Sequence, residues 1–385
     1  MRQPVRCGVD VLAAERCVSL HGRRIGLITN HTGVTRELHP TLDLLATTPE
    51  VLLLTLFSPE HGIRGDVDAP VADGVDGKTG LPIHSLYGAR TRPTAEQLHG
   101  LDTLVYDIQD VGARFYTFIT TLGQCMEAAA EHGLRFVVLD RPNPIGGVAI
   151  EGPIADADSL DFTAYHTLPV RHGLTVGELA RLFATEKRLN LELHVVKAEH
   201  WTRDMWWDET NLTWINPSPN MRSETQALLY PGIGLLEFTN VSVGRGTDTP
   251  FEHIGAPWIR ERELAGALND RGLPGVRFVP VRFTPTSSTH ARAACGGINF
   301  VITERARFHP LLTGFAVAEA LLRLFPQDWN HERYARLLVN SAAFAALVSG
   351  ATAESILQRC KPDLARFEER RKPILLYAAG RQSAG

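Results

Sequence analysis

Apolar runs of strand-like length recur four times in the first half of the chain, and each run ends in a polar cluster. The runs with their polar ends occupy residues 25–31, 51–62, 103–110 and 136–144. Helix-like stretches lie between them, near 37–47 and 117–132. Strands that alternate with helices are typical of a mostly parallel sheet covered by helices on both faces. The pattern therefore predicts a Rossmann-like, doubly wound α/β fold.

The polar ends of these runs predict a common cleft, because the carboxyl ends of parallel strands lie together in an open α/β sheet. Residues far apart in the sequence would meet there: Asn30, Glu60, Asp107, Asp110 and Asp140. A single residue of this kind is more simply explained as a turn former or a helix cap. Four clusters in succession favour the cleft. We expect Glu60 to share a cavity with Asp107 or Asp110 and with Asp140 or Asn143. The walls would come from residues 216–222 and 240–248.

The later part of the chain predicts a second domain. A helix follows residue 174, with a capping box between Thr175 and Glu178, and residues 191–196 alternate like a strand. From about residue 214 the pattern of the sequence changes. Strands are expected near 276–283 and 298–303, and helices near 311–325 and 353–370. One hydrophobic core rarely exceeds ~250–300 residues, so a chain of 385 residues predicts two domains. We place a Rossmann-like catalytic domain at 1–225 and a smaller α+β auxiliary domain, contributing to the cleft, at 226–385.

Charge and hydropathy argue against two classes of partner. The formal net charge is -4 and no basic run stands out, which argues against nucleic acid. No stretch reaches the ~20 apolar residues of a membrane helix, so we expect no membrane association. The first ten residues lack the apolar core of a signal peptide, which predicts a cytoplasmic protein as written. A secreted or periplasmic chain trimmed of its signal would read the same, and a homodimer is left open.

The familiar cofactor and hydrolase motifs are missing from the sequence: G-x-G-x-x-G, G-x-S-x-G and H-E-x-x-H. Residues 72–79 fit a relaxed phosphate-loop pattern, but residues 80–82 begin a helix poorly and the acidic loop would repel phosphate. A metal site would have to use residues without any defined ligand spacing: His61, His84, Asp107 and Asp110. We expect neither a cofactor nor a bound metal.

Several carboxylates are candidates for acid–base chemistry. Glu60 lies directly beyond a buried strand, where it is either a salt-bridged structural group or a partly buried proton donor. Glu151 sits among glycines, and a solvated loop carboxylate explains it equally well. Asp107 and Asp110 precede Arg114 and two aromatic residues. Carboxylates, guanidinium groups and aromatic faces are typical of sugar-binding clefts, although the acids and the arginine would also pair with one another.

At this point several long motifs together resemble one known family. They are residues 58–62, 107–117, 140–144, 151–153, 216–221 and 239–247. The resemblance, to the NamZ-type exo-β-N-acetylmuramidases of bacteria, runs from about residue 26 to about residue 373. It implies a Rossmann-like N-terminal domain, a smaller C-terminal domain and an open cleft near their junction. It also implies release of terminal N-acetylmuramic acid from the non-reducing end of peptidoglycan fragments.

The resemblance also implies roles for individual residues. The family's proposed catalytic glutamate maps onto Glu60 through the Ser-Pro-Glu-His-Gly motif, and a second acidic position maps onto Glu151. Our leading hypothesis is a metal-independent glycosidase in which Glu60 is the general acid and Glu151, Asp107 or Asp110 is its partner. Assistance by the substrate's acetamido group stays open. The alternatives are a non-catalytic binder of cell-wall sugars or muropeptides and a metal-dependent hydrolase.

Substrate-binding residues are expected in the same motif segments. The candidates are Asn30, His61, Arg64, Arg114, Tyr116, Asn143, Asn220, Arg222, Asn240 and Arg245. The lactyl group of muramic acid carries a carboxylate, and an arginine fork binds a carboxylate at two points. Arg114, Arg222 or Arg245 would be a fitting clamp. The alternative for each of them is hydrogen bonding that joins one loop to another.

Overall fold

A seven-stranded sheet forms the core of the N-terminal part of the molecule, which is a computed structural model that describes residues 3–64 and 72–380. The strand order is β3-β4-β2-β1-β5-β6-β9. The strands are β1 (Arg24–Thr29), β2 (Leu52–Ser58), β3 (Gly74–Val75), β4 (Pro82–Ser85), β5 (Thr103–Asp107), β6 (Arg135–Leu139) and β9 (Leu193–Val196). All neighbouring strands are parallel except β3, which runs antiparallel to β4. The prediction of a mostly parallel sheet is confirmed.

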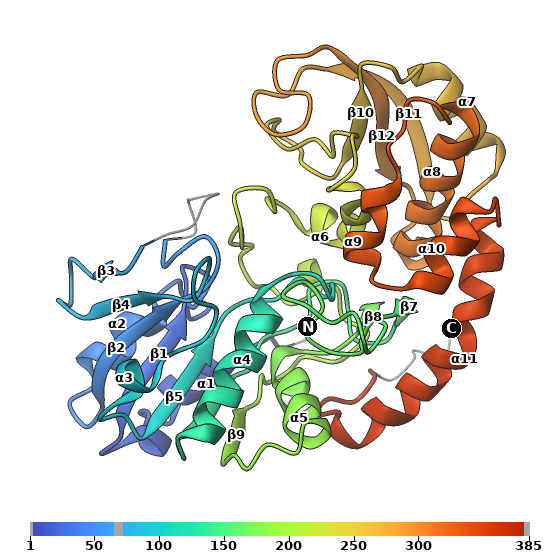
Figure 1. The fold of residues 1–385 in the computed structure, drawn as a ribbon. Coiled ribbons are helices and arrows are strands. Elements are labelled where there is room, and N and C mark those ends of the chain that lie inside the picture. The colour runs from blue at the N-terminus through green and yellow to red at the C-terminus, as the bar shows by residue number, and fades with distance from the viewer. Residues whose placement is uncertain (1–2, 65–71, 381–385) are drawn as a thin grey trace.

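Helices cover both faces of this sheet (Figure 1). They are α1 (Gly8–Ala14), α2 (Thr41–Thr47), α3 (Ala95–Leu98), α4 (Phe118–Glu131) and α5 (Val176–Glu186). Successive strand residues point to opposite faces. Accordingly Leu104 packs in one hydrophobic cluster with residues of α4 and α5, while its neighbour Val105 packs in another with residues of α1 and α2. This division of the apolar residues produces the doubly wound arrangement.

Local sequence signals fix two of these helices. The capping box before α5 forms as expected, since Glu178 N donates to Thr175 Oγ1 (3.2 Å) and Thr175 N donates to Glu178 Oε2 (3.1 Å). The helix expected at 37–47 begins later, at Thr41, because Pro40 occupies its N-cap. The preceding residues are held in a turn in which Thr41 N donates to the carbonyl of Gly33 (2.8 Å).

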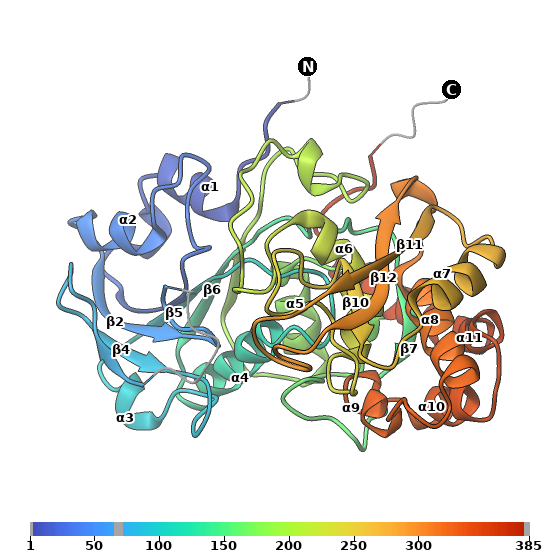
Figure 2. The same cartoon turned by 90° about the horizontal axis from the view of Figure 1, so that it is seen from above.

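The C-terminal part is built on a small antiparallel sheet of order β10-β12-β11, packed against helices. Its elements are β10 (His253–Ala256), β11 (Val276–Phe283), β12 (Cys295–Ile302), α6 (Glu224–Ile233), α7 (Glu261–Asp270), α8 (Pro310–Leu324), α9 (Ala335–Leu338), α10 (Ser341–Val348) and α11 (Ala353–Arg371). The predicted second, α+β unit is therefore present. Figure 2 shows α10 and α11 at the opposite end of the molecule from β2 and β4. Among the described residues no helix combines the length and apolarity needed to cross a bilayer.

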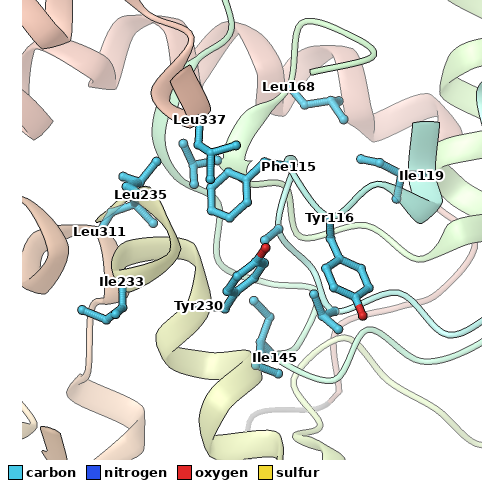
Figure 3. Close-up of a cluster of buried hydrophobic side chains, with 14 of the residues drawn as sticks. Phe115, Tyr116, Ile119, Ile145, Leu168, Tyr230, Ile233, Leu235, Leu311 and Leu337 are labelled. Atoms are coloured by element: carbon cyan, nitrogen blue, oxygen red, sulfur yellow. The ribbon is translucent and has the colours of Figure 1, made fainter. Parts of the chain in front are cut away.

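Buried residues from the two parts form one continuous hydrophobic cluster (Figure 3). Phe115, in the loop between β5 and α4, lies between Leu337 of α9 and Tyr230 of α6. The Phe115 and Tyr230 rings meet edge to face, with their centroids 5.0 Å apart. A short hairpin, β7 (Glu151–Ile154) with β8 (Pro169–Arg171), packs against α11. These contacts fix the two parts relative to each other, and the cavity described next lies where they meet.

Candidate active site

A cavity of about 420 Å³ opens where the two parts meet, and we call it the junction cavity. Its N-terminal wall comes from loops that follow β2, β4 and β5, which is the carboxyl edge of the sheet. Its C-terminal wall comes from α6, α9 and residues 237–251, and the loop at residues 218–221 adds to the N-terminal side. The polar and charged lining residues are Glu60, His61, Tyr87, Tyr116, Thr117, Asp161, Thr163, Ser218, Asn220, Tyr230, Glu237, Arg245 and Arg336.

Glu60 stands in a tight turn that directly follows β2. Gly62 N donates to the carbonyl of Pro59 (3.1 Å), and both His61 and Gly62 adopt left-handed backbone angles, with φ of 70° and 73°. A glycine is favoured at such a position because it has no Cβ to clash. The Ser-Pro-Glu-His-Gly motif is thus the sequence of a turn that directs Glu60 toward the junction cavity.

Thr117 holds the Glu60 carboxylate in place. The Thr117 hydroxyl donates a hydrogen bond to Glu60 Oε2. Thr117 is also the residue immediately before α4, so the carboxylate is held next to the start of a 14-residue helix. The geometry positions one carboxylate oxygen and leaves the other for a different partner.

Aromatic side chains form the inner wall of the junction cavity. Tyr230 makes edge-to-face contacts with Phe115, Tyr116 and Phe251, at centroid distances of 5.0, 5.9 and 4.8 Å. Burial raises the pKa of the Tyr116 and Tyr230 hydroxyls well above the usual range, and the charges of Glu60 and Glu237 add to this effect. Both tyrosines therefore keep their protons at neutral pH. Both residues contribute an aromatic ring to the wall, and Tyr230 also has a hydroxyl that can hydrogen-bond to whatever fills the cavity.

Glu237 supplies a second carboxylate that sequence reasoning missed. It follows the 3-10 helix η3 (Gly234–Leu236) and forms an ion pair with Arg245. Glu60 and Glu237 both line the junction cavity, and the charge of each adds to the rise in the pKa of Tyr116 and Tyr230. The available signal was its place two residues before the motif segment that begins at Thr239. Nothing in the apolar pattern distinguished it from an ordinary surface glutamate.

Sequence reasoning also missed Arg336, on the short helix α9, as it did the lining residues Thr117 and Tyr230. Its guanidinium carbon lies 4.2 Å from the centre of the Phe238 ring, and both side chains line the junction cavity. No motif marks this part of the sequence. Only the packing of α9 against the N-terminal part brings Arg336 to the cavity.

Four of the predicted residues do line the junction cavity: His61, Tyr116, Asn220 and Arg245, in addition to Glu60. The expectation that strand-end residues share this cavity is wrong for the others. Asp107 is fully buried, and Arg141 Nε donates to its Oδ1 (2.6 Å) while Arg141 Nη2 donates to its Oδ2 (3.0 Å). Thr41 donates a further bond to Asp107. These contacts occupy the Asp107 carboxylate and join β5 to the loop after β6.

Asp110, Asp140 and Asn143 also serve turns and caps. Asp110 Oδ2 accepts from Gly112 N (2.8 Å) and lies 3.3 Å from His172 Nε2. Asp140 accepts from the Thr175 hydroxyl (2.7 Å) and from Gly177 N (2.8 Å) at the start of α5. Burial raises the pKa of Asp140 to about 6. Asn143 Nδ2 donates to the Leu174 carbonyl, at 2.9 Å. The simpler explanation holds for all three.

Glu151 lies in β7 and does not line the junction cavity. Its carboxylate is 2.6 Å from Arg171 Nη1 and 3.7 Å from His309 Nδ1. Burial opposes its ionisation, but the hydrogen bond with His309 and the charge of Arg171 outweigh burial and lower the pKa of Glu151. In this structure Glu151 joins the β7–β8 hairpin to the start of α8. It is not a partner for Glu60 across the cavity.

The remaining predicted binding residues have structural partners. Arg114 is fully buried and donates to the carbonyls of Pro153, Leu168, Leu337 and Leu338, at 2.6 to 3.1 Å. It is not available to clamp a substrate. Asn30 Oδ1 accepts from Thr32 N (2.9 Å), and Asn240 bonds to the backbone of residues 328 and 330. Arg222 is exposed and donates to the Pro219 carbonyl (2.8 Å). Arg64 is exposed, 3.6 Å from Asp76.

Within residues 3–64 and 72–380, no group of three or more histidine, cysteine, aspartate or glutamate side chains is arranged to hold a metal ion. The segment that fits a relaxed phosphate loop forms a turn around Asp76. The Asp76 carboxylate accepts from Thr79 N (2.8 Å) and Lys78 N (3.2 Å), so it occupies the backbone donors that a phosphate would need. Residue 71 and the six before it lie outside the described part of the chain.

Comparison with known proteins places these features in a family. The N-terminal domain of exo-β-N-acetylmuramidase NamZ matches residues 25–225, and its C-terminal domain matches residues 228–377. The chain belongs to the NamZ family. It is 43% identical over 378 residues to the peptidoglycan β-N-acetylmuramidase NamZ of Bacillus subtilis, covering 97% of this chain and 91% of that protein. The resemblance drawn from the motifs is confirmed.

Two crystal structures of DUF1343 family proteins from Bacteroides fragilis share the NamZ family fold. One has a TM-score of 0.86 at 37% sequence identity, covering 98% of this chain and 100% of its own. The other has a TM-score of 0.79 at 29% identity, with the same coverage of both chains. The similarity spans both parts of the molecule, including their junction.

Proposed function

We propose that this protein is an exo-acting β-N-acetylmuramidase that releases terminal N-acetylmuramic acid from the non-reducing end of peptidoglycan fragments. Family membership and the 43% identity to the Bacillus subtilis enzyme support this activity. The observation that carries the mechanism is the Glu60 carboxylate, which Thr117 holds at the start of α4 inside the junction cavity. Glycoside hydrolysis requires such a positioned carboxyl group next to the scissile bond.

The junction cavity suits a single terminal sugar. Its volume of about 420 Å³ lies in the range of ~300–1,000 Å³ that is usual for small-molecule sites. A pyranose has C–H groups on its faces and hydroxyls at its edge, which match the aromatic rings and the polar groups of this wall. Tyr230 keeps a protonated hydroxyl for hydrogen bonding to the sugar, while Tyr116, whose hydroxyl is buried, contributes its ring. We assign sugar binding to this inner wall and the departing glycan to the open side.

Glu60 is the general acid in this proposal. It protonates the glycosidic oxygen as the bond to the anomeric carbon breaks, so that the leaving sugar departs as a neutral alcohol. The hydrogen bond from Thr117 fixes one oxygen of Glu60 and thereby aims the other. Proton transfer from a positioned side chain typically contributes about 10²–10⁴-fold in rate.

Glu237 is the second carboxylate that we assign to the reaction. It lines the same cavity, while Glu151, Asp107 and Asp110 do not. The charge of Arg245 stabilises the Glu237 carboxylate through their ion pair. A carboxylate at this position can activate water, attack the anomeric carbon or orient the 2-acetamido group for attack. Each of these roles brings a nucleophile to the anomeric carbon as positive charge develops on the sugar ring and the bond to the leaving oxygen breaks.

Turnover of a chromogenic β-N-acetylmuramide, with and without a chelator, tests this function. We expect hydrolysis that a chelator does not reduce. Binding without turnover would replace the proposal with a sugar-binding protein, and loss of turnover on chelation would replace it with a metal-dependent hydrolase. Product analysis of peptidoglycan glycan strands should show free N-acetylmuramic acid as the first product. Internal cleavage fragments appearing first would contradict the exo assignment.

A further inference from the structure

The two arginines of the junction cavity differ in their electrostatic surroundings. Arg245 forms an ion pair with Glu237, so much of its charge is compensated. Arg336 has an aromatic contact with Phe238, and the described residues provide it with no carboxylate partner. The cavity also contains the acidic residues Glu60 and Asp161. Arg336 is exposed at the cavity wall, so its guanidinium is accessible and can take an anionic group of a bound ligand as its partner.

The backbone that carries Arg336 is fixed from behind. The buried guanidinium of Arg114 donates to the carbonyls of Leu337 (2.9 Å) and Leu338 (2.6 Å), the two residues that follow Arg336. The same guanidinium donates to the carbonyl of Pro153 (3.1 Å) and so anchors α9 to the N-terminal part. Arg336 therefore projects from a rigid support at the cavity wall, which lowers the entropy lost when it binds a ligand.

Phe238 orients the Arg336 side chain itself. A guanidinium that lies over an aromatic ring is stabilised by the ring electrons, and the N–H groups at its edge still point outward. These edge N–H groups form the fork that binds both oxygens of a carboxylate. The contact with Phe238 thus presents a carboxylate-binding group to the cavity without neutralising it.

We propose that Arg336 binds the carboxylate of the 3-O-lactyl group on the terminal sugar and thereby selects N-acetylmuramic acid over N-acetylglucosamine. This inference rests on the proposed function. The two sugars differ only in the lactyl group, so a site for its carboxylate is the direct means of telling them apart. Arg336 replaces Arg114, Arg222 and Arg245 as the expected clamp, because those three are buried, outside the cavity or paired with Glu237.

Substitution of Arg336 tests the inference through a ratio. We compare kcat/KM for chromogenic β-N-acetylmuramide and β-N-acetylglucosaminide in the wild-type protein, in Arg336→Met and in Arg336→Lys. Methionine keeps an unbranched side chain over Phe238 and removes the fork. We expect Arg336→Met to lose about 10- to 100-fold on the muramide, the scale of a hydrogen bond to a charged group, with little change on the glucosaminide. The kcat/KM of Arg336→Lys on the muramide should lie between those of the wild-type protein and Arg336→Met, because lysine keeps the charge but not the fork.

Arg333→Met is the matched control, since Arg333 is exposed on the neighbouring turn and does not line the junction cavity. It should behave as wild type on both sugars. Equal losses of Arg336→Met on the two sugars, or an unchanged preference, would overturn the inference. Calorimetric binding of free N-acetylmuramic acid and N-acetylglucosamine separates this result from the proposed function. If the wild-type protein shows no turnover, the proposed function is wrong. If it nevertheless binds N-acetylmuramic acid more tightly than N-acetylglucosamine, and Arg336→Met does not, the role of Arg336 is still supported.

Discussion

At the scale of single residues, Glu60 and Glu151 are both glutamates in motif segments, but they have different surroundings. Glu60 lines a sugar-sized cavity, while Glu151 is held between Arg171 and His309 outside it. We expect Glu60→Gln and Glu237→Gln each to reduce kcat for the muramide by roughly 10²-fold or more, because each removes a reacting carboxylate. Glu151→Gln serves as the comparison and should keep most of the activity. Near-normal turnover by a folded Glu60→Gln protein would remove Glu60 from the mechanism.

Thr117 provides a second prediction at this scale. Its hydroxyl positions Glu60, so Thr117→Val should misplace the acid without removing it. We expect kcat to fall by about 10-fold with KM little changed, since a misaligned group mainly raises the barrier of the chemical step. Thr117→Ser, which restores the donor, should recover most of the rate. A loss that serine does not rescue would mean that Thr117 acts through packing.

Single residues also mark the limit of the sequence interpretation. An aspartate after a strand looks the same whether it caps a helix or faces a substrate. The structure decides for Asp107 because Arg141, 34 residues later in the chain, pairs with it. Glu60 was distinguishable because core packing does not explain a glutamate directly beyond a buried strand, and because it lies in the Ser-Pro-Glu-His-Gly motif. Glu237 and Arg336 became visible only when α6 and α9 were placed against the N-terminal part.

At the scale of elements, the pattern of apolar residues predicted the central strands and five of the eleven α-helices among the described residues, but not α6, α7 or the short helices. The helix expected at 117–132 is α4 (Phe118–Glu131), and the strand expected at 276–283 is β11 (Val276–Phe283). Buried positions repeat regularly in these elements, so periodicity was sufficient. The β7–β8 hairpin was not predicted because its strands span only four and three residues. Such short strands are held by tertiary contacts, which leave no period in the sequence.

The contact between α5 and α11 leads to a prediction about pH. Arg370 of α11 donates to both carboxylate oxygens of Glu186 in α5, at 2.9 and 2.7 Å. Burial opposes ionisation of Glu186, but the bonds from Arg370 and His166 outweigh it and lower its pKa from 4.5 to about 2. Between these values the unfolded chain binds a proton that the folded protein does not. The stabilisation is therefore complete above about pH 4.5 and is lost as the pH falls toward 2.

Urea unfolding at a series of pH values measures this contribution. Glu186→Gln should lower the free energy of unfolding at pH 7 by roughly 1–2 kcal/mol and make its dependence on pH shallower between pH 2 and 4.5. Glu332→Gln, at an exposed position, is the control and should follow the wild-type curve. Identical slopes for Glu186→Gln and wild type would show that this ion pair does not couple protonation to folding.

At the scale of the whole molecule, the active site depends on both parts of the chain. Glu60 and Thr117 come from the N-terminal part, while Glu237 and Arg336 come from the C-terminal part. The hydrophobic cluster around Phe115 and Tyr230 crosses between them without a break. A rigid junction keeps the general acid at a fixed distance from the groups that hold the sugar. Small displacements between such groups are costly in rate, so the continuous core has a direct catalytic consequence.

A continuous core also predicts that the two parts unfold together, although a chain of this size often shows several transitions. Leu264→Ala removes a fully buried side chain from α7, far along the C-terminal part, and should cost about 2–5 kcal/mol. If unfolding is cooperative, amide hydrogen exchange in β5 of the N-terminal part should accelerate by the same factor as exchange in β12. N-acetylmuramic acid at a concentration 100 times its Kd should raise the free energy of opening by about 2.7 kcal/mol, because it binds across the junction. The rise should be the same for β5 and for β12. Faster exchange confined to β12 would instead mean that the C-terminal part opens by itself, and the active site would then lose Glu237 and Arg336 whenever it does.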